Sequence, residues 1–387
     1  MNLLSGVHDP IEQARDAGRA TELPWTSFAE FFRSRVYDPH LVTRNFLTYC
    51  DDERHLRRAY TYAELGTIVE GLAQLFHTRL GLTRGDRIAT LLFNHDVTVL
   101  TYFAAWTLGI AVVPINIEEP PEKKRYILEH SEVSVVLCWQ DVYDEIKDLQ
   151  ADLPNLREVV ALGDSGLLDG KRSAAKTAQR GISKSLRLPP STSRLDDHAL
   201  IVYTSGTTGP PKGVILTVAN LLIDADAIAS WHGFGINDRV MCVLPIHHVN
   251  GIVVTLITPL YCKGSLVLNR KFKTGSFWRR LHEEDVTSVS VVPTLLEFLL
   301  DADEDITAYR LDRFGGVICG AGPLLKDTAA RFEDRFGFRI RHGYGLSETT
   351  CYSSFLPNEL TQEQHRHWLT GYEFPSIGLP LRHNMMT

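Results

Sequence analysis

The chain alternates short apolar runs with stretches that have helical spacing, and this alternation restricts its possible folds more than any other feature. Within residues 61–80 apolar side chains recur every three or four positions, and Thr61 with Glu64 has the spacing of a capping box. Repeated strand–helix units predict an α/β fold with a mainly parallel sheet and helices on both faces. The expected strands are residues 87–93, 111–117, 133–138, 200–202, 240–245, 265–268, 288–292, 316–319 and 339–344, and the expected helices are residues 61–80, 95–109, 122–131, 220–231, 251–261, 277–284, 293–301 and 326–336.

The alternation is interrupted once, which indicates two lobes. Residues 164–199 are rich in Ser, Lys, Arg, Gly and Pro and have little apolar periodicity, as expected for a polar linker. We therefore expect a first α/β lobe over residues 1–163, a second over residues 200–345, and a separate final segment at residues 346–387.

Composition excludes several classes of protein. A hydrophobic content of 44% with 22% charged residues is typical of a soluble globular chain, and a net charge of −7 disfavours a nucleic-acid partner. The six cysteines are scattered without a Cys-x-x-Cys pair, which favours reduced thiols in a cytoplasmic protein. No apolar run approaches the roughly 20 residues that an integral membrane segment needs.

A hydroxyl-rich glycine loop follows the expected strand at residues 200–202. Residues 203–214 are Tyr-Thr-Ser-Gly-Thr-Thr-Gly-Pro-Pro-Lys-Gly-Val. Glycines let backbone N–H groups turn towards an anion, hydroxyls donate hydrogen bonds, and Lys212 adds positive charge. Pro211 and Gly213 flank this lysine, whereas a Walker loop has Gly before the lysine and Ser or Thr after it. The residues therefore predict a polyphosphate-binding loop of another kind.

Two further segments follow expected strands, where ligands bind in open α/β sheets. Residues 244–251 contain the adjacent histidines His247 and His248 at the start of an expected helix. No carboxylate or cysteine lies nearby in the sequence to complete a metal site. Residues 320–324, Gly-Ala-Gly-Pro-Leu, are small enough for a flat ring to approach the backbone.

A third segment, residues 343–350, combines an aromatic ring, a hydroxyl and a carboxylate after the last expected strand. Tyr344 has a ring that can stack on a heteroaromatic base. Ser347 can donate to a phosphate oxygen, and Glu348 offers the oxygen ligand that Mg²⁺ prefers beside phosphates. The four segments together predict a nucleotide site.

These segments resemble the motifs of the acyl-adenylate-forming superfamily, which includes acyl- and aryl-CoA synthetases, luciferases and peptide-synthetase adenylation domains. The resemblance covers residues 45–387 and includes the family's phosphate loop, its substrate motif in the acyl-CoA synthetase form, its adenine motif and its Mg²⁺ motif. It implies two stacked, doubly wound α/β lobes. It also implies that residues 346–387 begin a β-barrel subdomain that is incomplete, and that the small C-terminal domain is absent.

The resemblance also implies a reaction and its residues. In this family a carboxylate attacks the α-phosphate of ATP, which gives acyl-AMP and pyrophosphate, and the thiol of coenzyme A or phosphopantetheine then takes the acyl group. The implied catalytic residues are His248, Lys212, Ser347 and Glu348, with Glu348 also the Mg²⁺ ligand. The implied ATP and AMP contacts are Thr204, Ser205, Gly206, Thr207, Thr208, Gly209, Lys212, Gly320, Ala321, Gly322, Pro323, Gly343, Tyr344, Gly345 and Ser347. The implied contacts to the acid are His247, His248, Val249, Asn250 and Gly251.

Two features of the family's pattern are missing. The last aspartate is Asp334 and the last lysine is Lys326, so the sequence contains neither the ribose-binding aspartate nor the C-terminal lysine of the family. We therefore expect a large-domain fragment that binds nucleotide weakly and adenylates poorly or not at all.

The sequence also favours one class of acid. No aspartate occurs between Arg239 and Glu284, so an α-ammonium group would lack its usual partner and an amino acid is disfavoured. The apolar residues 249–260 and 291–300 either line an acyl pocket or form core, and we expect a fatty or aryl acid. The alternatives are an inactive nucleotide- or acyl-binding module, an adenylation domain that loads an acyl carrier protein, and a luciferase-like oxygenase.

Overall fold

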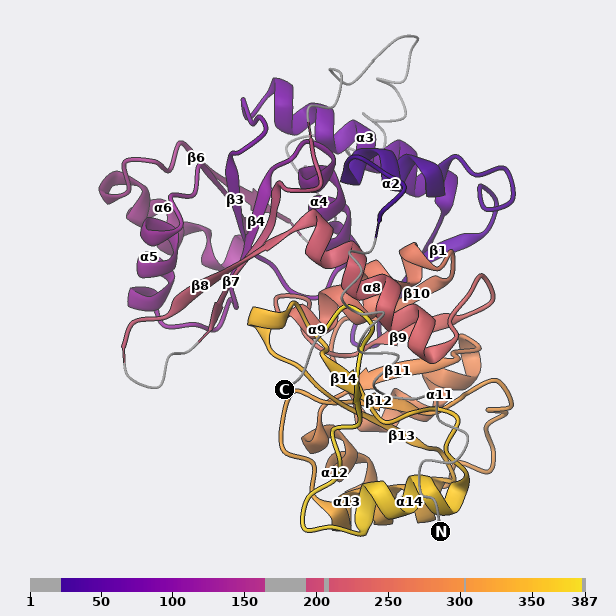
Figure 1. Cartoon of the computed structure of the whole chain (residues 1–387). Helices are drawn as coiled ribbons and strands as arrows, with labels where there is room; N and C mark the ends of the chain where they lie inside the picture. The colour runs from indigo at the N-terminus through magenta and orange to yellow at the C-terminus, as the bar shows by residue number, and fades with distance from the viewer. Residues whose placement is uncertain (1–21, 164–192, 205–208, 303, 385–387) are drawn as a thin grey trace.

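The computed structural model describes residues 22–163, 193–204, 209–302 and 304–384, whose strands form two sheets flanked by helices (Figure 1). The strands are β1 (Asn45–Asp51), β2 (Leu56–Thr61), β3 (Arg87–Leu91), β4 (Ala111–Pro114), β5 (Val135–Trp139), β6 (Glu158–Leu162), β7 (His198–Thr204), β8 (Lys212–Thr217), β9 (Arg239–Cys242), β10 (Ser265–Asn269), β11 (Ser288–Val291), β12 (Val317–Cys319), β13 (Ile340–Tyr344), β14 (Ser354–Phe355) and β15 (Leu379–Pro380). The α-helices are α2 (Phe28–Val36), α3 (Tyr62–Thr78), α4 (Asp96–Thr107), α5 (Pro121–His130), α6 (Tyr143–Leu149), α8 (Val218–His232), α9 (Val249–Ile252), α10 (Thr258–Tyr261), α11 (Thr274–Glu283), α12 (Pro293–Asp301), α13 (Lys326–Phe336) and α14 (Gln362–Thr370). The shorter turns are η1 (Gln140–Val142), η2 (Gln150–Asp152), the π-helical η3 (Val253–Ile257) and η4 (Ser347–Thr349).

The smaller sheet has six strands in the order β6-β5-β3-β4-β7-β8. Its strands run parallel except β8, which returns antiparallel to β7. The larger sheet has nine strands in the order β15-β14-β13-β12-β11-β9-β10-β1-β2. From β13 to β1 its strands are parallel, and antiparallel strands extend both edges. The expected α/β class with mainly parallel sheets is therefore confirmed.

The two sheets do not follow the order of the chain. The hairpin β1–β2 precedes every strand of the six-stranded sheet, yet β1 pairs with β10, with Leu47 opposite Leu266. Conversely, β7 and β8 follow the polar linker but join the six-stranded sheet, where Val112 lies opposite Leu200. The chain thus crosses between the sheets more than once, and the lobe boundaries expected from the sequence stay a prediction.

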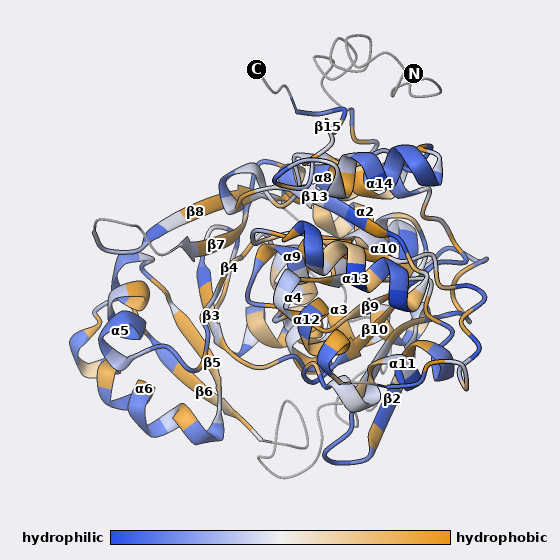
Figure 2. Cartoon of the chain, turned by 90° about the horizontal axis from the view of Figure 1, so that it is seen from below, coloured by the Kyte–Doolittle hydropathy of each residue, from blue (hydrophilic) through white to orange (hydrophobic). Residues whose placement is uncertain are grey.

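The molecule is layered, because alternate residues of each parallel strand enter different cores. In β3, Ile88 enters a central core that lies between the sheets, while Ala89 faces the core beneath α5 and α6. In β9, Cys242 enters the same central core, while Met241 packs with residues of α11, α12 and α13. Figure 2 shows α5 and α6 covering the outer side of the six-stranded sheet, with hydrophilic residues turned outward. Burial on both faces is what the continuous apolar runs of the strands require.

Several helices begin and end where local sequence dictates. Thr61 caps α3, and its hydroxyl and the side chain of Glu64 form both bonds of the predicted capping box. Residues 326–336 form α13, as expected, and Gly337 ends it with a left-handed φ of 74°. The helix expected over residues 251–261 begins at Val249 and includes the π-helical turn η3. Such turns occur often at functional sites.

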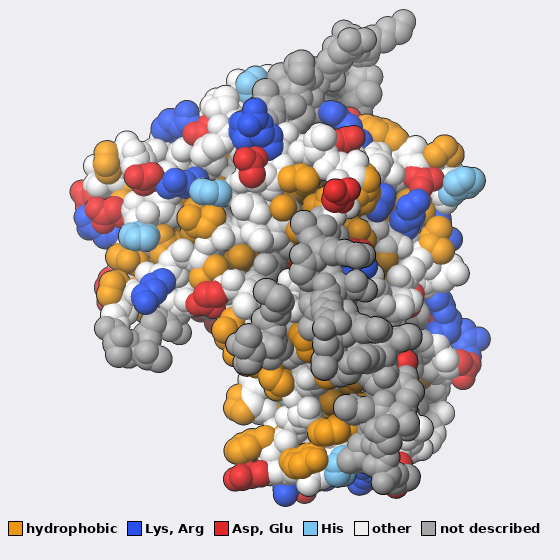
Figure 3. Space-filling model, in the orientation of Figure 1, with side chains coloured by type: hydrophobic (Ala, Val, Ile, Leu, Met, Phe, Trp, Pro, Cys, Tyr) orange, Lys and Arg blue, Asp and Glu red, His pale blue; other side chains and the backbone are white. Residues whose placement is uncertain are grey.

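Within the described ranges no helix is long and apolar enough to cross a bilayer. All six cysteines are free thiols, and each except Cys262 is buried. On the face seen in Figure 3, acidic and basic side chains are interspersed and form no patch of a single sign.

Candidate active site

The four segments singled out in the sequence meet at one cavity of about 1710 Å³. It lies at the carboxyl ends of the parallel strands β9, β11, β12 and β13 and beside the end of β7. Ligands bind at this edge in open α/β sheets because the chain turns away from the strand there and leaves backbone groups unpaired. The lining from the predicted segments is Thr204, Gly209, Lys212, His248, Val249, Asn250, Ala321, Gly322, Pro323, Gly343, Tyr344, Gly345, Ser347 and Glu348.

The glycine loop connects two antiparallel strands, which the sequence did not predict. Thr204 ends β7 opposite Lys212, the exposed first residue of β8. The loop is therefore the tip of a β-hairpin, whereas a Walker loop leads from a strand into a helix. Of the predicted phosphate contacts, Ser205, Gly206, Thr207 and Thr208 lie outside the described residues.

Helix α5 supports this hairpin through side chains that the sequence gave no reason to select. The Tyr126 hydroxyl donates to the carbonyl oxygen of Pro211 at 3.2 Å, and His130 Nδ1 lies 2.7 Å from the Tyr203 hydroxyl. Tyr126 and His130 both line the cavity. They fix the hairpin on the sheet side of the cavity.

The histidine segment is held by hydrogen bonds to its backbone. His248 is the N-terminal cap residue of α9, and its N–H donates to the carbonyl oxygen of Pro245 at 3.2 Å. A Cβ on Gly251 would lie 2.5 Å from that same oxygen, so this turn requires glycine. Among the described residues that line the cavity, His248 is present, whereas His247 and Gly251 are not.

Both histidines are neutral at neutral pH. Burial, together with the neighbouring His248, lowers the pKa of His247 to about 3. Burial also lowers the pKa of His248, an effect that Glu119 opposes and Lys123 reinforces. The two ring centroids are 4.4 Å apart, so charging both rings would bring like charges together. His248 can therefore offer a neutral imidazole at the cavity.

The segment after β12 is strained at its second residue. Ala321 has φ of 62°, a left-handed conformation that costs a residue with a Cβ about 1–2 kcal/mol. Ala321, Gly322 and Pro323 line the cavity, whereas Gly320 lies behind it against Tyr352. Such strain is often retained at ligand sites, because the surrounding structure holds the backbone in place.

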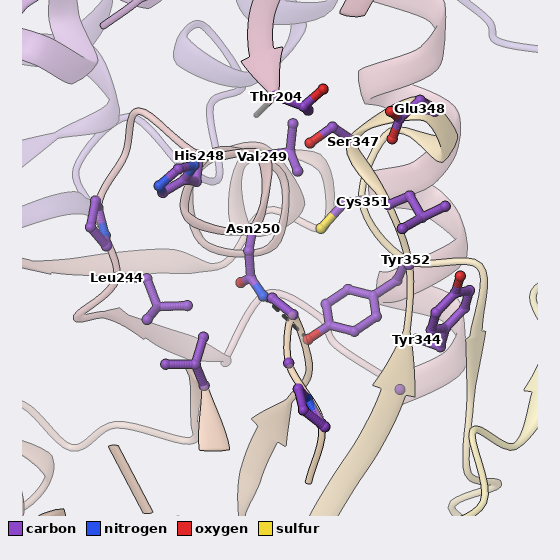
Figure 4. Close-up of a pocket in the computed structure, with 18 of the residues that line it drawn as sticks. Thr204, Leu244, His248, Val249, Asn250, Tyr344, Ser347, Glu348, Cys351 and Tyr352 are labelled. Carbon is purple, nitrogen blue, oxygen red and sulfur yellow. Dashed lines mark hydrogen bonds between the residues drawn. The ribbon is translucent and has the colours of Figure 1, made fainter. Parts of the chain in front are cut away.

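The last predicted segment forms a tight turn after β13. Ser347 and Glu348 lie in η4, where the Leu346 N–H donates to Thr349 Oγ1 at 3.0 Å. A Cβ on Gly345 would lie 1.6 Å from the carbonyl oxygen of Cys351, so no other residue fits this turn. Figure 4 shows Ser347 and Glu348 near Thr204, with His248 across the cavity.

The donor groups are suited to a metal ion that phosphates help to hold. Within the described ranges no group of three or more His, Cys, Asp or Glu side chains could hold a metal ion. Glu348 is an exposed carboxylate at the cavity, beside the hydroxyls of Thr204 and Ser347. Mg²⁺ is commonly held by one or two carboxylates together with substrate phosphates. Glu348 and these hydroxyls fit Mg²⁺ bound in that way, and they do not fit a metal ion held by protein ligands alone.

Comparison with known proteins decides the family. The family model described as "AMP-binding enzyme" matches residues 42–387, nearly the whole chain. The chain belongs to the family of AMP-binding enzymes. The resemblance to adenylate-forming enzymes that the sequence shows is therefore confirmed.

The curated relatives include two acid–CoA ligases. A sulfoacetate–CoA ligase of Cupriavidus necator is 33% identical over 297 residues, which is 76% of this chain and 55% of that protein. A crotonobetaine/carnitine–CoA ligase of Salmonella paratyphi A is 30% identical over 76% of this chain and 56% of its own length. This AMP-binding chain therefore spans about half the length of the curated relatives that it matches.

Solved structures share the fold. The ATP-bound MatB of Rhodopseudomonas palustris aligns with a TM-score of 0.73 and 25% identity over 91% of this chain and 64% of that one. The inhibitor-bound N-terminal domain of FACL13 from Mycobacterium tuberculosis aligns with a TM-score of 0.73 and 25% identity over 87% of this chain and 79% of that domain. An anthranilate CoA ligase in complex with anthranoyl-AMP has a TM-score of 0.77 at 19% identity, which extends the likeness of fold alone.

Some residues of the cavity carry no motif signal. They include Tyr126, His130, Val292, His342, Cys351, Tyr352, Phe374 and Ile377. The turn 343–350 could have pointed to Cys351 and Tyr352, which follow it directly. The others come from strands and loops whose arrival at the cavity depends on how the sheet is assembled.

Proposed function

We propose that this site binds ATP and a carboxylic acid and joins them as acyl-AMP. A carboxylate oxygen of the acid attacks the α-phosphorus, the bond from that phosphorus to the bridging oxygen breaks, and pyrophosphate leaves. A thiol such as that of coenzyme A then attacks the acyl carbon and AMP departs. One observation carries the proposal: segments as distant in sequence as Thr204 and Glu348 line the same cavity at the carboxyl edge of the sheets.

The phosphates are assigned to the hairpin side of the cavity. Lys212 and the hydroxyls of residues 204–208 bind the β- and γ-phosphates, and Ser347 donates to the α-phosphate. Their contribution is positioning and charge neutralisation, which dominate catalysis of phosphate transfer. Glu348 would hold Mg²⁺, which would supply positive charge to offset that of the phosphates.

The base and the acid are assigned to the other walls. Residues 321–323 present backbone to the adenine, and Tyr344, which is 42% exposed, has a ring free to stack on it. His248 is placed beside the carboxylate of the acid, where a neutral imidazole can donate or accept a hydrogen bond. The names of the relatives do not agree on one acid.

The extent of the match limits what is proposed for this chain alone. Because the chain spans 55% of the sulfoacetate–CoA ligase, we assign it nucleotide and acid binding with little adenylation by itself. We propose transfer to a thiol only for a chain as long as those relatives, in which this site is joined by further residues. Loading of a carrier protein and binding without catalysis remain the competing functions.

Calorimetry and pyrophosphate exchange test the assignment. ATP, AMP and a non-hydrolysable acyl-AMP mimic are titrated into the chain, alone and as Lys212→Ala, with the exposed Lys147→Ala as the matched control. A lysine–phosphate hydrogen bond is worth about 1.5–3 kcal/mol, so Lys212→Ala should weaken ATP binding about tenfold to a hundredfold. Binding of these ligands with little ATP–pyrophosphate exchange is the result expected for this chain, and binding of no ligand would refute the proposal.

A further inference from the structure

One wall of the cavity contains Asn250 and Tyr352, and we call it the inner wall. It carries a buried network of polar side chains. Ser290 Oγ donates to Asn250 Oδ1 at 2.6 Å, and Asn250 Nδ2 donates to the Tyr352 hydroxyl at 3.2 Å (Figure 4). Relative exposures are 0% for Ser290, 6% for Asn250 and 2% for Tyr352. These residues come from β11, α9 and the segment after η4, so only the fold brings them together.

The Asn250 side chain lines the cavity and has hydrogen-bonding capacity beyond its bonds to Ser290 and Tyr352. A carboxamide offers two N–H donors, and Tyr352 takes one of them. Among the described residues the Asn250 side chain has no hydrogen-bond partner besides Ser290 and Tyr352, and Asn250 and Tyr352 both line the cavity. A buried amide hydrogen without an acceptor costs about 1–3 kcal/mol, so a ligand that supplies an acceptor is favoured there.

The Tyr352 ring of this network is tightly packed, which fits a wall that does not yield to a long acyl chain. A Cβ on Gly320 would lie 2.5 Å from the Tyr352 hydroxyl oxygen and 2.7 Å from its Cε1, so the ring is packed directly on this backbone. Its other neighbour is Phe355, with ring centroids 4.3 Å apart. The apolar residues that follow Asn250 in sequence belong to the central core and are fully buried: Ile252, Val253, Val254, Leu256 and Ile257.

The apolar stretch at residues 291–300 gives the same result. Leu296 and Leu299 are fully buried in the core beneath α12, and from this stretch only Val292 lines the cavity among the described residues. The expectation of a fatty or aryl acid rested on these stretches as pocket lining. In the structure most of these residues form core, so they do not support a fatty or aryl acid.

The inner wall holds no fixed charge. Among the described residues of the lining, Lys212 and Glu348 are the only Lys, Arg, Asp or Glu side chains, and both lie with the phosphate segments. Burial lowers the pKa of His342, which donates from Nδ1 to the Ser376 carbonyl oxygen at 2.9 Å, so this ring is neutral. A sulfonate, a second carboxylate or an ammonium at the inner wall would be buried without a counter-charge.

We propose that the acid is a short hydroxy- or oxo-carboxylic acid whose uncharged oxygen accepts a hydrogen bond from Asn250. The Asn250–Tyr352–Ser290 network is then the specificity-determining element of the site, and the carboxylate end of the acid lies towards His248. This inference rests on the proposed function, since it names the acid that the same site activates.

Matched acyl-AMP mimics test the inference by calorimetry on the whole chain. The probes are sulfamoyl adenosines that carry 3-hydroxybutanoyl, 3-oxobutanoyl, butanoyl, decanoyl or sulfoacetyl groups. One added neutral hydrogen bond to a buried donor corresponds to about tenfold in affinity, so the hydroxy and oxo probes should bind about tenfold tighter than butanoyl. The decanoyl and sulfoacetyl probes should bind more weakly than butanoyl.

Substitutions at Asn250 and Tyr352 test whether these side chains cause the preference for the hydroxy and oxo probes. Asn250→Leu, which has nearly the same shape, should abolish the preference for the hydroxy and oxo probes, and Tyr352→Phe should reduce it about threefold while keeping the ring on Gly320. Tyr37→Phe, at an exposed tyrosine, is the matched control and should leave the preference unchanged. Thermal unfolding confirms that each variant is folded, and Tyr352→Phe keeps the test open if Asn250→Leu does not fold.

The outcomes separate the inference from the proposed function. Equal or tighter binding of butanoyl, decanoyl or sulfoacetyl overturns the assigned acid while the adenylate site stands. A preference that survives Asn250→Leu also overturns it. Failure of every mimic, with failure of AMP itself, sinks the proposed function instead.

Discussion

A single carboxamide, Asn94, positions the segment that carries His248, and its removal should cost a large part of the stability. Asn94 Nδ2 donates to the carbonyl oxygens of Leu244 at 2.8 Å and Asn269 at 3.2 Å, and its Oδ1 accepts from the Ile246 N–H at 2.9 Å. Asn94 is only 6% exposed, so water cannot easily replace these bonds. The side chain thus ties β3 to the ends of β9 and β10.

The expected magnitude follows from counting the groups left without partners. Asn94→Ala takes the partner from the Ile246 N–H and a donor from the carbonyl oxygens of Asn269 and Leu244, of which the Leu244 oxygen keeps only the weak Cys242 thiol donor. Each group that stays unpaired in the interior costs about 1–3 kcal/mol if nothing relaxes. Partial relaxation makes about 3–5 kcal/mol the expected loss in the free energy of unfolding. That is a large fraction of the 5–15 kcal/mol typical of a folded domain.

Urea unfolding followed by tryptophan fluorescence measures this loss. Asn155→Ala, at an exposed asparagine, is the matched control and should fall within about 0.5 kcal/mol of the parent chain. Asn94→Asp keeps the acceptor for Ile246 but turns a carboxylate towards the carbonyl oxygens of Leu244 and Asn269. Burial then raises its folded pKa above the unfolded value, so the variant should gain stability relative to the parent as the pH falls. If Asn94→Ala unfolds at the same urea concentration as Asn155→Ala, the positioning role is refuted.

Four further substitutions test other parts of the structure. Arg58 lies 3.1 Å from Asp96, which is fully buried, so Arg58→Met should lower the free energy of unfolding by about 3 kcal/mol in urea titrations. Burial acts to raise the pKa of Asp96, but its hydrogen bonds and the neighbouring positive charges have the larger effect, and the net pKa is lowered. The destabilisation by Asp96→Asn should therefore be present at pH 7 and shrink as the pH falls below about 4. Ala321→Gly should relieve the left-handed strain and raise stability by up to about 1 kcal/mol in thermal unfolding, and a lower stability would contradict the strain. Gly345→Ala would force a Cβ against the Cys351 carbonyl, and calorimetry should show loss of nucleotide binding while circular dichroism shows an unchanged fold.

Local sequence predicted much of the secondary structure because its signals act over a few residues. The capping box of Thr61 and Glu64 and the boundaries of α13 depend on neighbouring hydrogen bonds and helical periodicity, and both appear where expected. The hairpin β1–β2 was not predicted, because its alternation is weak and its pairing with β10 is a long-range contact. Helix α4 is buried along its whole length, so it was recognised from its apolar content and not from one apolar face.

The candidate site divides in the same way. The motif residues that line the cavity could be selected from the sequence, because hydroxyls, glycines and charges cluster there within a few positions of one another. Their functional roles stay a prediction. Asn94 and Tyr126 could not be selected, since each acts through a partner more than eighty residues away: Asn94 on Ile246 and Tyr126 on Pro211.

By itself, the sequence determined that the chain is an α/β protein with a nucleotide-type loop, because periodicity and loop composition are properties of consecutive residues. The tertiary structure alone decided which sheet each strand joins and which side chains form the inner wall of the cavity. It also decided that the apolar stretches after Asn250 and Val292 are mostly core. Those outcomes depend on pairing and packing between distant segments, and the spacing of residues along one segment does not show which other segment it contacts.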